Sequence, residues 1–343
     1  MPRPPFQRDG FIGQKRKVNY LMRLVEGAVS LGKPIPNLLL CGAPGLGKSA
    51  LVEMLAAVTK RGLRKITASS RLGLSALLLA LRELKANAIL LIDEGHALSG
   101  PLQLLVCGAV EDHRIPTMEK LPHGASAIAT AYTDIPPFTL IVATDQPDLL
   151  SEALRSRLGP PVELTPYPTS EMREIVSRLC ENETMTVSTH AVTLLAEASH
   201  GNPRRARQLV GTLAHYEPNR AVLIQRADVM AFLKESGVNE QLLDEQSQVY
   251  LVALLEAAGP VTPEAFAARL GRRRRWVKET EFFLFRKNLV TPTPKGRILT
   301  PEGRRQALRI QAEAAAEGGV DSAEGVTSMP SLEQPDESDR KEN

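Results

Sequence analysis

Apolar residues are spaced in two different ways along the first half of the chain. Residues 37–42, 87–94 and 138–145 are nearly continuous apolar runs, and the stretches between them have apolar residues at helical spacing. Short continuous runs of this kind are typical of parallel strands that are covered on both faces. The alternation therefore predicts an α/β fold with a parallel sheet, which we assign to residues 1–166.

Strand-like runs disappear after residue 167, and helical spacing continues to about residue 237. Serine or threonine precedes these helical segments and glycine follows two of them, as expected at helix ends. The pattern predicts a small helical domain over residues 167–242.

A different order of elements begins at residue 243. A helix that closes at Gly271 is followed directly by a second helix, by two short strands around a Pro-Lys-Gly turn, and by a further helix from Pro301. Helix, tight turn, helix and hairpin is the order found in winged-helix domains. We therefore predict a winged helix over residues 243–312.

The charge of this last domain indicates a function. The chain has 42 basic and 39 acidic residues, a net charge of +3, but residues 253–312 alone hold thirteen basic and five acidic ones. Residues 313–343 hold nine acidic and two basic residues and are predicted to be a disordered tail. A module with such an excess of basic charge is typical of proteins that meet nucleic-acid phosphates. DNA is therefore the expected partner of the winged helix.

Composition excludes several classes of protein. Cys41, Cys107 and Cys180 are far apart and form no Cys-x-x-Cys pair, which argues against a disulfide framework or a zinc site. No apolar run approaches the roughly 20 residues needed to span a bilayer, and the N-terminus does not resemble a signal peptide. We expect a cytoplasmic protein with reduced cysteines and no membrane contact. The six histidines lack metal-ligand spacing, so we expect structural roles for them.

Residues 42–49 read GAPGLGKS and match the phosphate-binding pattern G-x-x-x-x-G-K-[ST]. The segment follows a predicted strand and precedes a predicted helix, which is the context that the pattern needs. Glycines let backbone N–H groups curl around phosphate oxygens, and the helix N-terminus adds partial positive charge. Lys48 is expected to neutralise the β- and γ-phosphates and Ser49 to ligate Mg²⁺. ATP and Mg²⁺ are therefore the predicted ligands.

A second predicted strand supplies two carboxylates, because the apolar run 87–94 ends in Asp93 and Glu94. Asp93 is expected to hold the metal and Glu94 to polarise the attacking water, as in other enzymes that transfer phosphoryl groups. An isolated Asp-Glu pair would more often cap the next helix. The phosphate-binding pattern at Lys48 favours the catalytic interpretation.

Five motifs, taken in order, resemble those of a known family. They are GAPGLGKS, LIDEGHAL, PPFTLIVAT, LRSRLG and GNPRRA. Their order and spacing are similar to those of AAA+ ATPases, and most of all to the RuvB family of Holliday-junction branch-migration motors. The resemblance runs from Phe11 to about Thr300 and implies an ATPase domain, a helical lid and a winged helix. The PPFTL segment, His96 and the wing at 293–297 are more specific than a general ATPase match.

The resemblance also implies roles for single residues around the nucleotide. Phe11 and Ile12 would lie beside the adenine, and Tyr167 is similar to an aromatic residue that flanks the base. Thr144 resembles the first sensor, which contacts the γ-phosphate or the attacking water. The expected ATP-binding residues of the phosphate loop are Gly42, Pro44, Gly45, Leu46, Gly47, Lys48, Ser49 and Ala50.

Two arginines are similar to residues that act between domains or subunits. Arg204 matches the second sensor, a lid residue that couples nucleotide state to lid position. Arg157 resembles the finger that reaches the nucleotide of a neighbouring subunit. An arginine supplied in trans stabilises charge in the transition state and makes hydrolysis depend on assembly. The resemblance therefore implies a homo-oligomeric ring, expected to be a hexamer.

The sequence departs from the family pattern at two places. Asp145 and Gln146 replace the residues that usually follow the first sensor, which is expected to alter hydrolysis without removing it. In residues 114–136 the family carries the hairpin that docks on its partner RuvA, but here the segment reads GASAIATAY near its tip. With so little apolar area for anchoring, docking on a RuvA-like partner is expected to be weak.

Four consecutive arginines open the second helix of the predicted winged helix. They are Arg272, Arg273, Arg274 and Arg275. A block of like charge is most often solvated surface, but beside a wing we expect the run to track DNA phosphates in a salt-sensitive contact. Trp276, Phe282 and Phe283 are expected to pack inward. By resemblance, Lys295 and Arg297 of the wing are expected to reach a groove of the DNA.

Three functions fit these features to different degrees. The leading hypothesis is an ATP-driven ring motor that translocates duplex DNA, most of all at Holliday junctions. The alternative is a loader or regulatory switch, in which ATP controls assembly on DNA or on a protein without translocation. A DNA-binding regulator with a vestigial ATPase is disfavoured because the whole expected catalytic set is present. That set is Lys48, Asp93, Glu94, Thr144, Arg157 and Arg204.

Overall fold

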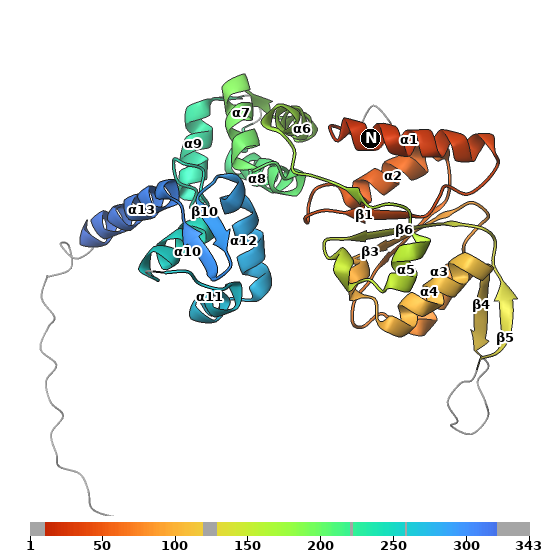
Figure 1. The fold of residues 1–343 in the computed structure, drawn as a ribbon. Helices are drawn as coiled ribbons and strands as arrows, with labels where there is room; N and C mark the ends of the chain where they lie inside the picture. The colour runs from red at the N-terminus through yellow and green to blue at the C-terminus, as the bar shows by residue number, and fades with distance from the viewer. Residues whose placement is uncertain (1–10, 119–128, 220–221, 258, 321–343) are drawn as a thin grey trace, which may run out of the picture. The chain divides into compact units, whose positions relative to one another are not determined.

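The computed structural model describes residues 11–118, 129–219, 222–257 and 259–320 (Figure 1). The chain divides into two units, Met1–Leu233 and Lys234–Asn343. The first unit has a sheet-based part followed by a helical part, and the second contains the basic module. Within the described residues, no helix is both long and apolar enough to cross a membrane.

The sheet of the first unit has five parallel strands. They are β1 (Leu38–Cys41), β2 (Leu63–Thr67), β3 (Ile89–Asp93), β6 (Thr139–Thr144) and β7 (Val162–Glu163). Their order in the sheet is β2-β3-β6-β1-β7. The three predicted apolar runs become β1, β3 and β6, which confirms the α/β class. Because neighbouring strands are parallel, the segments that follow β1, β3 and β6 meet at one edge of the sheet, the edge formed by the carboxyl ends of the strands.

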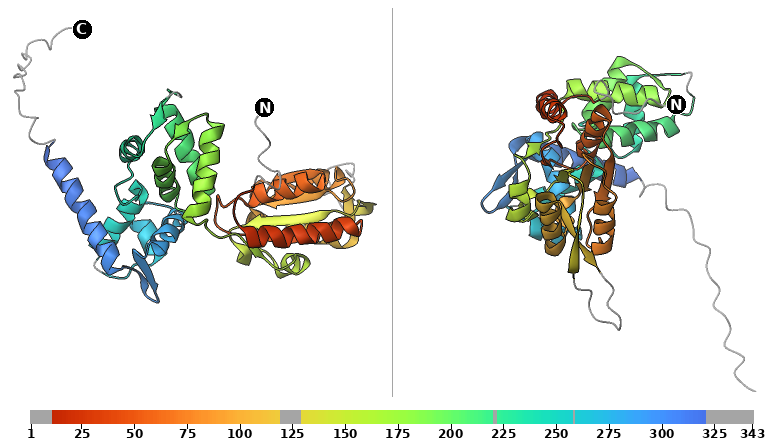
Figure 2. Two further views of the ribbon diagram at one scale, coloured as in Figure 1. Left: turned by 90° about the horizontal axis from the view of Figure 1, so that it is seen from above. Right: turned by 90° about the vertical axis from the view of Figure 1, so that its right-hand side faces the viewer.

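Helices cover both faces of this sheet. α1 (Lys15–Ser30) and α2 (Lys48–Thr59) lie over one face, where Figure 2 (left) shows them side by side in red and orange. α3 (Leu74–Arg82), α4 (Gly100–Asp112) and α5 (Glu152–Arg157) lie on the other face.

The two covered faces explain why the strand sequences are continuously apolar. All six residues of β6 are buried. Successive side chains of a strand point to opposite faces, so each strand feeds two layers of core. The layer against α3, α4 and α5 contains Leu90, Ile92, Leu140 and Val142 of the strands and Leu77, Leu81, Val106 and Leu154 of the helices.

Two further parts complete the first unit. An antiparallel hairpin, β4 (Arg114–Met118) and β5 (Ala129–Asp134), follows α4, and residues 119–128, which include the first part of the alanine-rich segment at 124–132, lie outside the described residues. The helical part consists of α6 (Thr169–Asn182), α7 (Thr189–Ala198), α8 (Pro203–Tyr216) and α9 (Arg226–Glu235). A two-residue parallel pair, β8 (Thr186–Val187) and β9 (Leu223–Ile224), joins the loops of these helices.

The second unit has the predicted order of elements. α10 (Glu245–Glu256), α11 (Pro263–Arg269) and α12 (Arg274–Arg286) precede the hairpin of β10 (Val290–Thr293) and β11 (Gly296–Leu299). Thr262 caps α11 by accepting a hydrogen bond from the backbone N–H of Ala265. The core of this unit gathers apolar residues from all three helices and the hairpin around Tyr250, Phe266 and Leu284.

The last helix corrects one prediction. α13 spans Pro301–Val320, so residues 313–320 are helical although the sequence predicted disorder from residue 313. The segment QAEAAAE consists of strong helix formers, and their propensity outweighs the acidic composition of this stretch. Residues 321–343 of the predicted tail lie outside the described residues.

Candidate functional site

The phosphate loop connects the end of β1 to the first turn of α2. Gly42, Gly45 and Gly47 all have positive φ, at 139°, 86° and 97°. Residues with a Cβ rarely adopt such angles. At Gly45 the requirement is also steric, because a Cβ there would lie 2.3 Å from the side-chain oxygen of Asn202. The loop therefore keeps a bare backbone facing the start of α2, as an anion site requires. Within the loop the side chain of Leu46 is buried, and Ala50 follows in the first turn of α2.

Lys48 and Ser49 point their polar atoms in two directions. The Lys48 ammonium donates hydrogen bonds to the carbonyl oxygens of Gly42 (2.7 Å) and Ala43 (3.2 Å). The Ser49 hydroxyl donates to Oδ2 of Asp93 at 2.7 Å, across from the end of β3. Burial lowers the pKa of Lys48 below its ordinary value, opposed by the nearby carboxylates of Asp145, Glu94 and Asp93. The expected metal-binding pair is thus brought together, and the cationic side chain lies beside it.

Glu94 and Thr144 lie at the carboxyl ends of the neighbouring strands β3 and β6. Glu94 stands one residue beyond β3 with a φ of 54°, the left-handed region that non-glycine residues rarely occupy. Thr144 ends β6 and is fully buried. His96, in a short 3₁₀ turn (Gly95–Ala97), contacts both: its Nδ1 lies 3.1 Å from the Thr144 hydroxyl and 3.5 Å from the Glu94 carboxylate. Glu94, the expected base, and Thr144, the expected first sensor, therefore share His96 as a neighbour. The sequence predicted only a structural role for this histidine.

Arg157 lies away from this edge, at the end of α5. Its Nε donates to the Glu111 carboxylate at 2.9 Å, and its Nη1 donates to the carbonyl oxygen of Ala153 at 2.7 Å. Glu111 belongs to the Glu111-Asp112 pair at the end of α4, both of them exposed. The expected arginine finger is therefore held by a neighbour within its own subunit.

Two aromatic residues border the phosphate loop on the side expected for the base. A Cβ placed on Gly47 would lie 3.6 Å from the Phe11 ring and 3.6 Å from the Tyr167 hydroxyl. Tyr167 is buried, which raises the pKa of its hydroxyl, and the hydroxyl donates to the carbonyl oxygen of Leu46 at 3.4 Å. Ile12 is half-buried beside Phe11. Phe11 and Tyr167 thus lie together, although 156 positions separate them in the sequence.

The helical part of the first unit approaches the phosphate loop through the start of α8. The backbone N–H of Arg204 points at the carbonyl oxygen of Gly45, at 3.4 Å, while its side chain is exposed and close enough to Lys48 to lower the pKa of that ammonium. Asn202, which precedes α8, donates from its amide to the carbonyl oxygen of Pro44 at 3.0 Å. Asn202 was not among the expected site residues. Its position before a proline signalled only a helix cap.

In the second unit, the two wing residues behave differently. Lys295 is exposed in the turn between β10 and β11. Arg297 instead donates two hydrogen bonds, of 3.1 and 3.2 Å, to the carboxylate of Glu281, whose side chain is only 4% exposed. The Tyr250 hydroxyl donates to the same carboxylate at 2.9 Å, and burial with this charge raises its pKa. The geometry therefore does not support a groove contact by Arg297, because a buried carboxylate already engages its guanidinium.

The arginine run also differs from the expectation. α12 begins at Arg274, so Arg272 and Arg273 precede it. Arg272 stacks over the Trp276 ring at 5.8 Å, and Arg274 pairs with Glu264 of α11 at 2.6 Å. Arg273 is exposed at the start of the helix, and the side chain of Arg275 lies outside the described part of the chain.

The three aromatic residues of α12 do not all pack inward. Trp276 and Phe283 pack against the core of the second unit, as expected. Phe282 is 43% exposed, so the expectation for this residue was wrong. Consecutive helix positions turn by about 100° on a helix of roughly 3.6 residues per turn, and Phe282 and Phe283 cannot face the same side.

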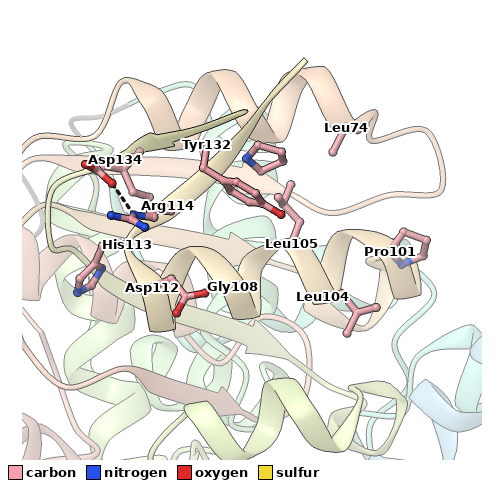
Figure 3. Close-up of a pocket in the computed structure, with 12 residues that line it drawn as sticks. Leu74, Pro101, Leu104, Leu105, Gly108, Asp112, His113, Arg114, Tyr132 and Asp134 are labelled. Atoms are coloured by element: carbon pink, nitrogen blue, oxygen red, sulfur yellow. Dashed lines mark hydrogen bonds and ion pairs between the residues drawn. The ribbon is translucent and has the colours of Figure 1, made fainter. Parts of the chain in front are cut away.

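An open groove of about 1060 Å³ lies between α4 and the β4–β5 hairpin (Figure 3). Its apolar lining includes Leu104, which is 65% exposed, and Tyr132, which is 70% exposed. An ion pair at the foot of the hairpin, between Arg114 and Asp134 at 2.7 Å, borders the groove. Leu104 of α4 thus adds exposed apolar surface beside Tyr132, which the alanine-rich segment of the sequence already contained.

The sheet order, the phosphate loop and the carboxylates after β3 define the class of protein: a P-loop nucleotide-binding ATPase. Residues 3–164 match the family described as "Holliday junction DNA helicase RuvB P-loop domain". The Holliday junction branch migration complex subunit RuvB of Streptomyces griseus is 31% identical over 301 residues, which are 87% of this chain and 82% of the relative. The subunit of the same name from Thermotoga maritima is 30% identical over 306 residues, or 86% and 89% of the two chains.

A solved structure agrees with these sequence relatives. The Thermotoga maritima RuvB Holliday junction branch migration motor superposes with a TM-score of 0.77 at 29% identity, covering 88% of this chain and 97% of that one. The chain therefore belongs to the RuvB family, and the resemblance found in the sequence is confirmed.

Proposed function

We propose that the chain is an ATP-driven ring motor that binds and translocates duplex DNA, with branch migration of Holliday junctions as its task. The observation that carries the proposal is the convergence of Lys48, the Ser49–Asp93 pair and Glu94 at one sheet edge, in a chain that also has a basic module of winged-helix order. The family relatives named for this activity support it.

The residues present fit the binding of Mg²⁺ with nucleotide. Ser49 and Asp93 bring a hydroxyl and a carboxylate oxygen to within 2.7 Å of each other, and both are ligand types that Mg²⁺ prefers. When bound, the ion would supply positive charge that offsets the charge of the phosphates. Lys48 would exchange its two carbonyl acceptors for phosphate oxygens, and Phe11 and Tyr167 would flank the base.

Hydrolysis then depends on three further side chains. Glu94 would polarise the attacking water, and Thr144 would fix that water or the γ-phosphate. Arg157 would leave Glu111 and reach the nucleotide of an adjacent subunit, so a hexameric ring would be the active form. Arg204 would report the nucleotide state to the lid.

In this proposal, the second unit contacts the DNA. Lys295 in the wing turn and Arg273 before α12 are exposed cations and would meet phosphates. A RuvA-like protein is a proposed partner at the hairpin. The exposed Tyr132 and Leu104 support apolar docking there. We also propose a cytoplasmic location, which the three buried free thiols of Cys41, Cys107 and Cys180 support.

The test is ATP hydrolysis with and without junction DNA, using the wild type, Lys48→Ala and Arg157→Ala. Each variant alone should lose the DNA-stimulated rate. Mixing the two should restore part of it, because a Lys48→Ala subunit can lend its arginine to an Arg157→Ala neighbour that binds nucleotide. An unchanged stimulated rate in both variants would overturn the mechanism.

A junction-migration assay separates this motor from the alternative, a loader or switch. The alternative remains open because loaders use the same nucleotide residues. Hydrolysis together with junction movement supports the motor. Hydrolysis without strand movement, under the same conditions, supports the switch.

A further inference from the structure

His96 lies between the carboxyl ends of β3 and β6, where the expected catalytic residues meet. Its Nδ1 lies 3.1 Å from the hydroxyl of Thr144, 3.3 Å from Oδ1 of Asp145 and 3.5 Å from Oε2 of Glu94. The His96 side chain is only 17% exposed. A single ring nitrogen therefore faces three oxygens that belong to the ends of β3 and β6.

Local packing fixes the ring in this place. Gly95 passes so close to β6 that a Cβ on it would lie 2.3 Å from Cγ1 of Val142. A side chain at position 95 would push the 3₁₀ turn outward and carry His96 away from Thr144. The left-handed backbone of Glu94 begins this turn. The segment is shaped to bring the imidazole against the end of β6.

The charges around Nδ1 decide which atom donates. A neutral imidazole has one N–H, and its other nitrogen carries a lone pair. Two carboxylates within 3.5 Å of Nδ1 favour the tautomer with hydrogen on Nδ1, because a lone pair there would be repelled by both. The Thr144 oxygen already accepts from the backbone N–H of Gln146 at 3.0 Å and can accept from His96 as well.

We propose that His96 is a positioning residue for ATP hydrolysis: its Nδ1–H donates to Thr144 and attracts the nearby carboxylate of Glu94, so that both side chains act on one water. The inference deepens the proposed function and rests on it. Asp145, which departs from the family pattern, supplies a second carboxylate 3.3 Å from Nδ1 that keeps the ring turned towards this edge. Deleting the donor leaves nucleotide binding intact, because none of the contacts of His96 involve the phosphate loop.

Two substitutions of His96 separate the donor from the bulk of the side chain. Asparagine carries an amide N–H close to the place of Nδ1, whereas leucine fills a similar volume and donates nothing. His96→Leu should lower kcat for DNA-stimulated hydrolysis by about 10- to 100-fold while KM and the affinity for a fluorescent ADP analogue change by less than about threefold. His96→Asn should stay within about threefold of wild-type kcat. Equal losses in the two variants would overturn the proposal.

A double-mutant cycle tests whether His96 acts through Thr144. Thr144→Val should cost much less in the His96→Leu background than in the wild type, and additive losses would overturn the proposed link. Binding of the ADP analogue shows that the leucine variant is folded, and His96→Ala takes its place if it does not bind. Lys48→Ala and Glu94→Gln distinguish the two proposals. If these controls keep the wild-type rate, the ATPase mechanism fails, and if they lose it while His96→Leu does not, only the role of His96 fails.

Discussion

The side-chain amide of Asn202 donates a hydrogen bond to the carbonyl oxygen of Pro44 at 3.0 Å, and so joins the first turn of α8 to the phosphate loop. The oxygen of the same amide accepts from the backbone N–H groups of Arg204 and Arg205 and caps the helix. One side chain therefore contacts both α8 and the loop that would bind phosphate. We expect movement of the helical part to pull on this loop.

We predict that two substitutions of Asn202 separate these roles. Serine preserves a capping oxygen but is too short to reach Pro44, whereas alanine loses both functions. Asn202→Ala should lower the free energy of unfolding by about 1 kcal/mol and Asn202→Ser by much less. Both should weaken nucleotide binding to a similar extent. Thermal unfolding and titration with an ADP analogue measure the two effects, and wild-type affinity in both variants would show that the Pro44 contact is irrelevant to nucleotide.

A second prediction concerns the pairing of Arg157 with Glu111. Because Glu111 is exposed, solvent screens the pair and its attraction is weak. Glu111→Gln should free the finger and lower the protein concentration at half-maximal hydrolysis by at most about fivefold. Arg157→Ala should cost about 1000-fold in rate, and Arg155→Ala, an exposed neighbour on α5, should cost little. A loss in Glu111→Gln as large as in Arg157→Ala would mean that Glu111 takes part in the active arrangement.

The wing provides a third prediction, through the contrast between Lys295 and Arg297. Lys295→Gln should weaken DNA binding and reduce the salt slope of log K by about one, without changing stability. Arg297→Gln leaves the carboxylate of Glu281 buried without its cation, which should cost about 3–5 kcal/mol of unfolding free energy. In the Glu281→Gln background the same substitution should cost far less. Equal costs in the two backgrounds, with a reduced salt slope, would instead make Arg297 a direct DNA contact.

The arginine run gives a fourth prediction. Replacing Arg272, Arg273, Arg274 and Arg275 together by glutamine should flatten the salt dependence of DNA binding. Arg273→Gln alone should reduce the slope by about one, and Arg274→Gln by less because Glu264 already pairs with Arg274. Binding titrations over a range of salt concentrations measure each slope. An unchanged slope in the fourfold variant would return the run to ordinary solvated surface.

In the central sheet, sequence patterns identified the strands that are buried on both faces, and they missed β2 and β7. β2 has the sequence LRKIT and is an outermost strand of the sheet. Three of its five residues are exposed. Charged residues are tolerated there because one side of an edge strand meets water. β7, β8 and β9 have two residues each, too few for any periodicity. The helix that continues to Val320 was not predicted, because the acidic composition of this stretch favoured disorder while its helix propensity favoured a helix.

The nucleotide site was predictable wherever its residues lie in one contiguous motif. The loop at 42–49 and the pair after β3 each carry their signal locally. Asn202 and His96 do not, because their contacts with Pro44 and Thr144 come from the packing of separate elements. Arg297 shows the opposite failure: its place in the wing suggested DNA, and only the burial of Glu281 reveals its internal partner. Side-chain direction and long-range contacts are the information that local patterns lack.

At position 94 the backbone is left-handed, so the residue that gives the most stable fold differs from the residue that the proposed ATP hydrolysis requires. An L-residue in this region costs about 1 kcal/mol that glycine would not incur, partly offset by the greater freedom of glycine in the unfolded chain. Glu94→Gly should therefore unfold at a higher temperature than Glu94→Ala, although both variants lack the carboxylate and should hydrolyse ATP equally poorly. A chain selected for stability alone would place glycine here. In the proposed mechanism, the glutamate at this position exchanges part of this stability for turnover.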